Sequence, residues 1–398
     1  MRVLYAEAVY DDEEISAVLN VLKNNPHQLM SGENVRKFEQ QVAKIFGKNY
    51  GIMVNSGSSA NLLAINSLSL KPGSEIITPA LTFSTTVAPI VQLGLVPAFV
   101  DVEPSTFVID CGLIEEMITE NTKAMLIPNL IGNLPDWNRI KQLADKYSLI
   151  VMEDSADTIG YSFDGGNTGQ INDVVTSSFY ASHIVTGAGF GGIMCTNNEA
   201  FAESATIMRS WGRASSLRDE SEEVEQRFNT KVDGIEYDAK FMFNSMGYNF
   251  IPSELSAAFG LVQLKKLEKY KVIRQENYLA LLNYFRLYEE FFILPSQLNI
   301  TDTPMLAFPF IIKDGAPFSR RDMQIWFEEN GIQTRTVFTG NILRHPGFKH
   351  IDRKESPSGY PNSNRVMSGG MLIGCHHGIN NIQLDYIQET LKNFIGSR

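Results

Sequence analysis

The chain has 398 residues, of which 43% are hydrophobic and 20% are charged, a composition typical of a globular protein with a sizeable core. Its formal net charge of −11 argues against nucleic-acid and anionic-membrane partners, because both would repel the protein at long range. Small-molecule chemistry is the better expectation.

Between about residues 50 and 200, apolar and β-branched runs alternate with helical stretches. The runs that predict strands are 75–81, 97–102, 124–130, 149–154 and 173–179. This alternation is typical of βαβ units, so it predicts an α/β fold with a mostly parallel sheet and helices on both faces. Ligands of such sheets bind beyond the carboxyl ends of the strands, where we look for the site.

The C-terminal half has a different pattern. The charged stretch 218–227 is predicted to stay in water as a loop or helix face, and residues 254–285 have the apolar spacing of one or two long helices. Residues 308–313 and 319–335 then indicate a strand and a helix of a smaller α+β domain. We expect a large domain at 1–250 and a small domain at 251–398.

Neither a secretory signal nor an apolar stretch of bilayer length is visible, so we expect a cytoplasmic protein. The three cysteines, Cys111, Cys195 and Cys375, lack CxxC spacing. We expect them to be buried free thiols, because neither a disulfide framework nor a zinc site is indicated.

The first chemical motif is SGSSAN, residues 56–61, between the apolar run 51–54 and the helical segment 60–68. Free backbone N–H groups and the positive end of the helix dipole hold a phosphate at such a position. The motif is therefore a candidate phosphate site, although serine there is often an ordinary N-cap.

Asp154 ends the predicted strand 149–154, so its side chain is expected at the ligand edge of the sheet. A carboxylate there pairs with a protonated pyridine nitrogen and keeps the ring able to accept electrons; alternatively, it caps the next helix. Asp157 is expected one helical turn away and facing the same site.

Hydroxyl groups also end the strand 173–179, and the glycine-rich run 187–192 follows them. These hydroxyl groups are placed to contact phosphate, and glycines let the backbone pass close to a ligand. His183 lies between the two segments, where a lone histidine is more often structural. Phe83 follows another strand and would stack on a flat cofactor, unless it is a core aromatic.

Five motifs, taken in order, resemble those of the DegT/DnrJ/EryC1/StrS sugar aminotransferases. They are SGSSAN, TFSTT, EDSAD, SFYASH with its glycine-rich run, and GYNFIPSELSAAFGLVQLKKLEK. The resemblance continues through TRTVFTGNILRHPGF and covers nearly the whole chain. It implies an aspartate-aminotransferase-like fold of type I, with a mostly parallel central sheet and a smaller C-terminal α+β domain. The implied cofactor is pyridoxal 5'-phosphate or pyridoxamine 5'-phosphate.

The resemblance also assigns side chains to the cofactor. It assigns the phosphate to Ser58, Ser59 and Ser178, and the pyridine nitrogen to Asp154. It assigns the ring hydroxyl region to Asp157 and the ring face to Phe83. Asn249, in GYN, resembles the residue that a second subunit sends into the phosphate site, which implies a homodimer with a shared active site. Arg335 is a candidate substrate contact.

In that family, the residue five positions after the phosphate-binding serine is the lysine that binds the cofactor covalently. Counted from Ser178, this position holds His183, and no lysine occurs between Lys146 and Lys231. A subgroup with histidine there consists of 3-dehydratases acting on nucleotide-linked 4-keto-6-deoxyhexoses. The resemblance thus implies that a 4-keto-3,6-dideoxy sugar is made with His183 as acid and base, a role that suits an imidazole.

Such dehydratases form two branches. One carries an iron–sulfur cluster and takes electrons from a reductase, whereas the other uses the cofactor alone with L-glutamate as amine donor. The cluster branch has cysteines after a WGR motif, where this chain has Ala214, Ser215 and Ser216. We expect no cluster and no metal, because three cysteines cannot supply four thiolate ligands. GNILRHP is at least as similar to the cluster branch, so the nucleotide and the electron source stay open.

Two other functions remain. One is a nucleotide-sugar aminotransferase of the same fold with a noncovalently held cofactor, and the other is a catalytically inactive, sugar-nucleotide-binding descendant. A decayed site is disfavoured, since Asp154, Ser178 and SGSSAN are all present. A nicotinamide dehydrogenase is disfavoured because no GxGxxG links an early strand to a helix.

Overall fold

The central sheet of the computed structural model is mostly parallel, as the sequence predicts. The structure describes residues 1–218 and 224–398, so part of the charged stretch 218–227 lies outside the described residues. Within them, seven strands form this sheet in the order β1-β9-β8-β5-β4-β2-β3. Among the seven, β9 alone runs in the direction opposite to the other six. The strands are β1 Tyr50–Val54, β2 Glu75–Pro79, β3 Val96–Val100, β4 Thr122–Pro128, β5 Ile150–Asp154, β8 Val174–Ser178 and β9 Gly192–Thr196.

The five predicted strands correspond to β2, β3, β4, β5 and β8. The sequence did not predict β9, because this five-residue strand begins at the last glycine of the glycine-rich run and offers only a short apolar signal. This strand brings the run 187–192 back beside β1 and β8.

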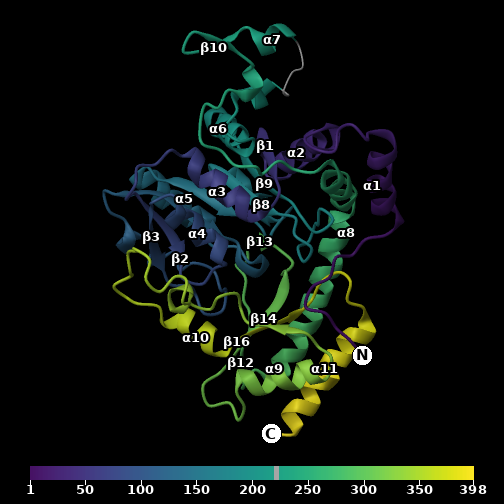
Figure 1. The fold of residues 1–398 in the computed structure, drawn as a ribbon. Helices are drawn as coiled ribbons and strands as arrows, with labels where there is room; N and C mark the ends of the chain where they lie inside the picture. The colour runs from purple at the N-terminus through teal and green to yellow at the C-terminus, as the bar shows by residue number, and fades with distance from the viewer. Residues whose placement is uncertain (219–223) are drawn as a thin grey trace.

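Helices cover both faces of the central sheet (Figure 1). Ile52 and Val54 of β1 pack with α3 and α6, whereas Met53 packs with α2 and α8 on the opposite face. Successive strand residues point to opposite faces, so a strand that is apolar at every position is buried on both. These helices are α2 Glu33–Ile45, α3 Gly57–Ser67, α4 Ser84–Gln92, α5 Trp137–Tyr147, α6 Glu199–Arg209 and α8 Glu254–Phe285.

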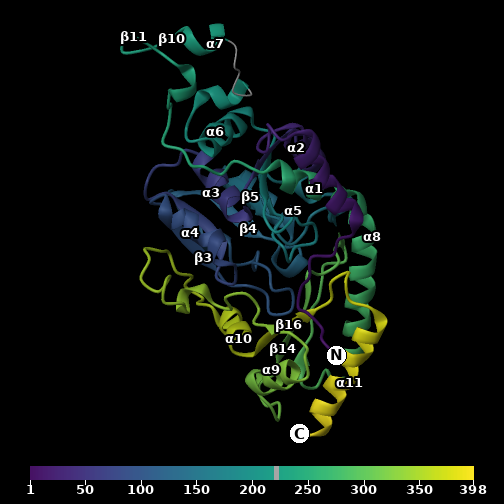
Figure 2. The same cartoon turned by 45° about the vertical axis from the view of Figure 1, so that its right-hand side comes forward.

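The predicted helical stretch 254–285 is one continuous helix, α8, which joins two sheets (Figures 1 and 2). Its first half packs Ala257 and Leu267 on the central sheet, and its second half packs Tyr278 and Phe285 on a four-stranded antiparallel sheet. The strand order there is β12-β14-β16-β15. The domain boundary after residue 250 stays a prediction.

The C-terminal elements follow the predicted order of strand and helix. The run 308–313 corresponds to β14, and the stretch 319–335 forms α9 and then β15. The bounds are β12 Phe292–Ile293, β14 Ala307–Ile312, α9 Arg320–Glu329, β15 Thr334–Arg335, α10 Pro361–Gly369, β16 Gly370–Gly374 and α11 Asn381–Gly396.

An arm, residues 224–246, stands out from the body on the side away from the C-terminal sheet (Figures 1 and 2). It contains α7 Val224–Phe228, β10 Thr230–Val232 and β11 Ile235–Tyr237.

Helix α1, Asp12–Asn24, lies on the outside of α8. A three-stranded sheet in the order β13-β6-β7 is formed by β6 Ser162–Phe163, β7 Gly166–Asn167 and β13 Thr301–Asp302. Across the described parts of the chain, no helix is both long and apolar enough to span a membrane.

A buried carboxylate from α8 caps the distant helix α2. The N-cap residue of α2, Gly32, makes no side-chain cap. Instead, Glu254 accepts hydrogen bonds from the backbone N–H groups of Asn34 at 3.0 Å and Val35 at 2.9 Å. This negative charge satisfies first-turn donors and lies at the positive end of the helix dipole, so it fixes α2 against the start of α8.

Candidate active site

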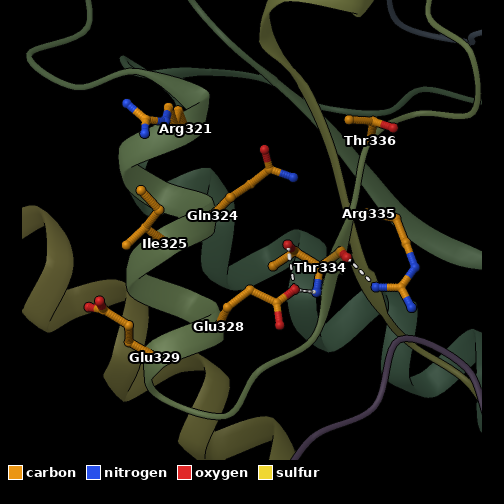
Figure 3. Close-up of a pocket in the computed structure, with 8 residues that line it drawn as sticks. All are labelled: Arg321, Gln324, Ile325, Glu328, Glu329, Thr334, Arg335 and Thr336. Atoms are coloured by element: carbon orange, nitrogen blue, oxygen red, sulfur yellow. Dashed lines mark hydrogen bonds between the residues drawn. The ribbon is translucent and has the colours of Figure 1, made fainter.

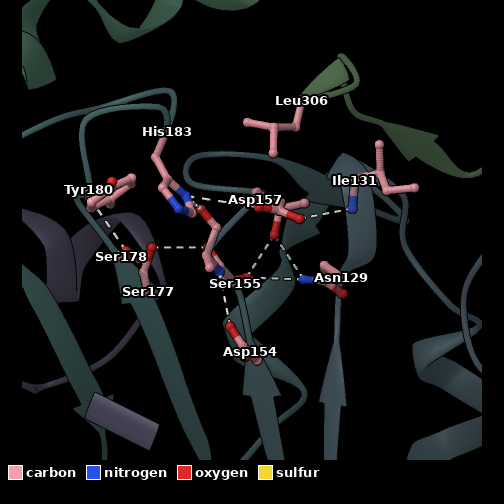
Figure 4. A network of polar contacts seen from close by, with 12 residues as sticks. Asn129, Ile131, Asp154, Ser155, Asp157, Ser177, Ser178, Tyr180, His183 and Leu306 are labelled. Carbon is pink, nitrogen blue, oxygen red and sulfur yellow. Dashed lines mark hydrogen bonds and ion pairs between the residues drawn. The ribbon is translucent and has the colours of Figure 1, made fainter. Parts of the chain in front are cut away.

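The predicted site residues gather beyond the carboxyl ends of the central strands (Figure 4). Asp154 ends β5, Ser178 ends β8, and Ile131 follows β4. His183 and Asp157 come from the connections after β8 and β5 and meet above these ends. The topology therefore brings residues from three strand ends into one place, as the parallel sheet predicts.

The N-terminus of α3 forms a cradle with the end of β8. Ser56 is the N-cap and accepts a hydrogen bond from the N–H group of Ser59 at 3.1 Å. A Cβ atom on Gly57 would lie only 2.6 Å from the Cβ of Ser178, so glycine is needed for this approach. The N–H groups in the first turn of α3 have no acceptor inside the helix, and they therefore lie next to the Ser178 side chain. This donor set fits a phosphate group.

Ser58 and Ser59 differ in their surroundings. The Ser59 hydroxyl donates to Asn55 Oδ1 at 2.7 Å, whereas the Ser58 hydroxyl makes no hydrogen bond with any described residue. Both line a cavity of about 150 Å³ whose wall includes Thr85 and Phe250. Ser58 is therefore the freer of the two to bind a ligand.

Asp154 is nearly buried, and its carboxylate is held by two side-chain donors and by the backbone N–H group of Ala156, which donates to Oδ1 at 3.2 Å. Asn61 Nδ2 and Thr86 Oγ1 donate to Oδ2 at 2.9 and 3.0 Å, and the hydroxyl of Thr176 donates to Asn61 Oδ1 at 2.5 Å. The carboxylate is thus fixed in direction, and the turn after it is not a helix that it would cap. Sequence reasoning gave Asn61 and Thr86 no role, although both lie in the motifs SGSSAN and TFSTT.

His183 and Asp157 form a pair in which Asp157 is buried and His183 is largely shielded from water. The side chains are 16% and 8% exposed, and His183 Nδ1 lies 3.8 Å from Asp157 Oδ1. The same Nδ1 atom lies 2.5 Å from the carbonyl oxygen of Ala156, while the N–H group of Ile131 donates to Asp157 Oδ2 at 2.9 Å. The expectation of a helical turn was wrong, because residues 155–160 form turns after β5.

Burial shifts the pKa values of both members in opposite directions. Loss of water raises the pKa of Asp157 to about 7, although the Ile131 N–H group works against this rise. Burial lowers the pKa of His183, and its contact with the Ala156 carbonyl opposes that change. Both shifts favour the neutral forms of the two side chains.

Phe83 is not a core aromatic, since its side chain is 53% exposed. It precedes α4, and its ring packs edge-on against Phe338 at a centroid distance of 6.1 Å. An exposed ring at the ligand edge of the sheet is available to cover a flat ligand.

The structure does not join Arg335 or Asn249 to this cluster by any hydrogen bond or ion pair among the described residues. Arg335 lines a groove of about 530 Å³ beside α9 (Figure 3), and its guanidinium carbon lies 5.5 Å from the centre of the Tyr5 ring. Asn249 is exposed and forms an isolated antiparallel bridge with Ser210.

Comparison with known proteins gives one consistent picture. Residues 9–392 match the DegT/DnrJ/EryC1/StrS aminotransferase family. The dTDP-4-dehydro-2,6-dideoxy-D-glucose 3-dehydratase of Saccharopolyspora spinosa is 33% identical over 98% of this chain and 85% of its own. The GDP-4-keto-6-deoxy-D-mannose 3-dehydratase of Escherichia coli O55:H7 is 32% identical over 97% of this chain and 98% of its own.

A solved structure is similar to this chain in both fold and sequence. GDP-4-keto-6-deoxymannose-3-dehydratase with a trapped PLP-glutamate geminal diamine superposes with a TM-score of 0.87 and 30% identity. The superposition covers 98% of this chain and 100% of that one. Sequence and fold agree over nearly the whole length, and the chain therefore belongs to the DegT/DnrJ/EryC1/StrS aminotransferase family.

Proposed function

We propose that this protein removes the C3 hydroxyl group of a nucleotide-linked 4-keto-6-deoxyhexose and releases a 4-keto-3,6-dideoxy sugar, with pyridoxal or pyridoxamine phosphate as cofactor. The observation that carries the proposal is the pair His183–Asp157 beside Asp154, at the position that the family resemblance gives to lysine. Two relatives that match most of the chain are named 3-dehydratases, one for a dTDP-linked and one for a GDP-linked sugar. The nucleotide is therefore left open.

We assign the cofactor phosphate to the first turn of α3 and to the hydroxyl groups of Ser58, Ser59 and Ser178. The fixed carboxylate of Asp154 is the partner of the pyridine nitrogen, and the exposed ring of Phe83 covers one ring face. The bound cofactor supplies an amine for the C4 ketone and a conjugated ring that accepts electrons.

His183 is the proposed acid and base. A distance of 2.5 Å from Nδ1 to a carbonyl oxygen requires a proton on Nδ1, because two lone pairs would repel each other. In the neutral imidazole the Nε2 atom then carries the free lone pair. Nε2 takes a proton from the reacting centre, and the resulting imidazolium gives a proton to the departing C3 hydroxyl group.

Asp157 stabilises the charge that His183 acquires. In its ionised form, which predominates above about pH 7, the carboxylate lies 3.8 Å from Nδ1 and attracts an imidazolium more strongly than a neutral ring. The N–H group of Ile131 keeps the carboxylate in place. We also place Asp157 beside the hydroxyl region of the cofactor ring, as the family resemblance implies.

We propose L-glutamate as the amine donor, so that each turnover yields one 2-oxoglutarate and one ammonia. The structure of a relative, GDP-4-keto-6-deoxymannose-3-dehydratase, holds a trapped PLP-glutamate geminal diamine, which supports this choice. The three cysteines pack in or against three different hydrophobic clusters, so this chain has no group of thiolates to hold an iron–sulfur cluster.

We further propose a homodimer in which Asn249 of the partner subunit completes the phosphate site. Two exposed apolar surfaces support an interface. One is the arm, whose exposed side chains include Phe241, Phe243 and Met246, and the other is the stripe Ile15, Leu19 and Leu22 on α1. Exposed apolar groups gathered in this way are typical of protein contact surfaces. A cytoplasmic location stays a prediction.

The test is a reaction of the purified protein with pyridoxal phosphate, L-glutamate and GDP-, dTDP- or CDP-linked 4-keto-6-deoxyhexoses. We expect mass spectrometry to show loss of the C3 oxygen from one of these sugars, together with equal amounts of ammonia and 2-oxoglutarate. A stable amino sugar that keeps its C3 hydroxyl group would identify an aminotransferase instead. Binding without turnover of any of the sugars would indicate the inactive descendant.

A further inference from the structure

A tight turn from the C-terminal part of the chain, Val337–Gly340, holds the loop that carries Phe83. The hydroxyl group of Thr339 donates to the carbonyl oxygen of Thr82 at 2.7 Å, and the Phe338 ring meets the Phe83 ring edge-on, at 79°. Just beyond the turn, the N–H group of residue 342 donates to the carbonyl of residue 80 at 3.0 Å. Three contacts therefore tie the turn and the residues just after it to Phe83 and to the residues that precede it.

The turn is held in a conformation that phenylalanine rarely adopts. Phe338 has a φ of 42°, in the left-handed region that is unfavourable for a bulky residue. The N–H group of Gly340 closes the turn on the Val337 carbonyl at 2.9 Å, and a Cβ atom on Gly340 would lie 2.5 Å from Met367. Such strain persists where the surroundings enforce it, and it is concentrated at functional sites.

We propose that Phe338 is a positioning residue for the cofactor, which it serves by holding the Phe83 ring in the orientation that covers the cofactor ring. This inference rests on the proposed function, in which Phe83 lies against the cofactor. Among the described residues, Phe338 is the only aromatic side chain whose ring contacts Phe83. More than half of the Phe83 side chain is exposed, so without Phe338 the ring would be free to rotate away.

The variants separate the ring from the strained backbone. Phe338→Gly removes the ring and relieves the strain, Phe338→Tyr keeps the ring, and Phe348→Leu reduces a partly buried aromatic that packs elsewhere in the same region. We expect Phe338→Gly to weaken binding of pyridoxal phosphate about three- to tenfold, as loss of one aromatic contact implies. It should also reduce the induced circular dichroism of the bound cofactor, while Phe338→Tyr and Phe348→Leu resemble the wild type.

A double variant shows whether Phe338 acts through Phe83. We expect Phe83→Ala alone to weaken cofactor binding, and adding Phe338→Gly to it to produce no further loss. Should Phe338→Gly fail to fold, Phe338→Asn replaces it, because asparagine adopts positive φ more readily. Wild-type affinity and dichroism in the ring-deleted variant would overturn the inference and leave the proposed function intact. If the wild type itself does not bind the cofactor, the proposed function fails, and the inference fails with it.

Discussion

The proposed function places His183 at the position where the family resemblance implies a lysine that binds the cofactor, so His183→Lys tests this placement. We expect His183→Lys to retain pyridoxal phosphate through dialysis and to show the added mass after borohydride reduction. C3 dehydration should fall about hundredfold or more, because the acid and base is lost. His183→Asn is the control, and it should lose dehydration without binding the cofactor covalently. Unchanged dehydration in the lysine variant would remove His183 from the mechanism.

Asp157 makes the stability of the fold depend on pH. Its pKa is raised in the folded state from 3.8 to about 7, so the folded protein holds this proton more tightly than the unfolded chain. The stabilisation is complete below pH 3.8 and is lost as the pH rises through about 7. A buried ionised carboxylate therefore destabilises the wild type at high pH.

The variant Asp157→Asn isolates this effect, because its amide stays neutral while its oxygen still accepts from Ile131. We expect its unfolding free energy, relative to the wild type, to rise by about 3–5 kcal/mol between about pH 4 and about pH 8. Urea denaturation at both values measures the difference. Asp352→Asn, which alters an exposed carboxylate, should show no such trend, and a flat difference for Asp157→Asn would contradict the assigned shift.

At the scale of elements, helix termini are capped by carboxylates from distant segments. Asp101 follows β3 and accepts from the N–H groups of Asn362 and Ser363, both at 2.8 Å, at the start of α10. Helix α10 has no side-chain cap of its own, as is also true of α2, which Glu254 caps. Each carboxylate satisfies donors that would otherwise be buried without a partner. Asp101 therefore fixes α10 to the central sheet, and Glu254 fixes α2 to α8.

For α2 this predicts a specific loss of stability. We expect Glu254→Gln to lower the unfolding free energy by about 1–3 kcal/mol, since the charge at two first-turn N–H groups is lost in a buried place. Glu33→Gln is the matched control, because Glu33 lies in the same first turn but is exposed and forms an ion pair with Lys37. Its effect should stay below about 0.5 kcal/mol. Equal losses in denaturation experiments would show that the buried cap adds nothing.

At the scale of the whole molecule, the exposed apolar side chains of the arm predict that the protein forms a dimer. We expect the wild type to sediment as a dimer and the double variant Phe241→Glu, Phe243→Glu to sediment as a monomer, since charges replace apolar contact groups. Binding of pyridoxal phosphate should weaken in the monomer, because Asn249 of the partner subunit no longer reaches the phosphate. The control is Ile325→Glu, an exposed apolar residue on α9. A monomeric wild type would contradict the proposal.

Much of the fold was visible in local patterns. Strands with β-branched and apolar runs, and the long apolar spacing of α8, follow from side-chain periodicity that each segment carries alone. The same holds for Asp154 and Ser178, whose places at strand ends follow from the direction of parallel strands. Residues 192–196 gave too short a signal beside glycines, so the strand that carries the glycine-rich run back to the sheet was missed.

The sequence by itself determined five strands of the central sheet and the long helix α8, their order, and which polar side chains end the strands. Only the tertiary structure decided how His183 and Asp157 are held, since the Ala156 carbonyl beside His183 and the Ile131 N–H group that donates to Asp157 belong to the backbone and leave no residue signature. It also decided that Phe338 meets Phe83 across more than two hundred residues of chain. Contacts of this kind depend on the path of the whole chain rather than on local preference, which is why no pattern in the sequence announces them.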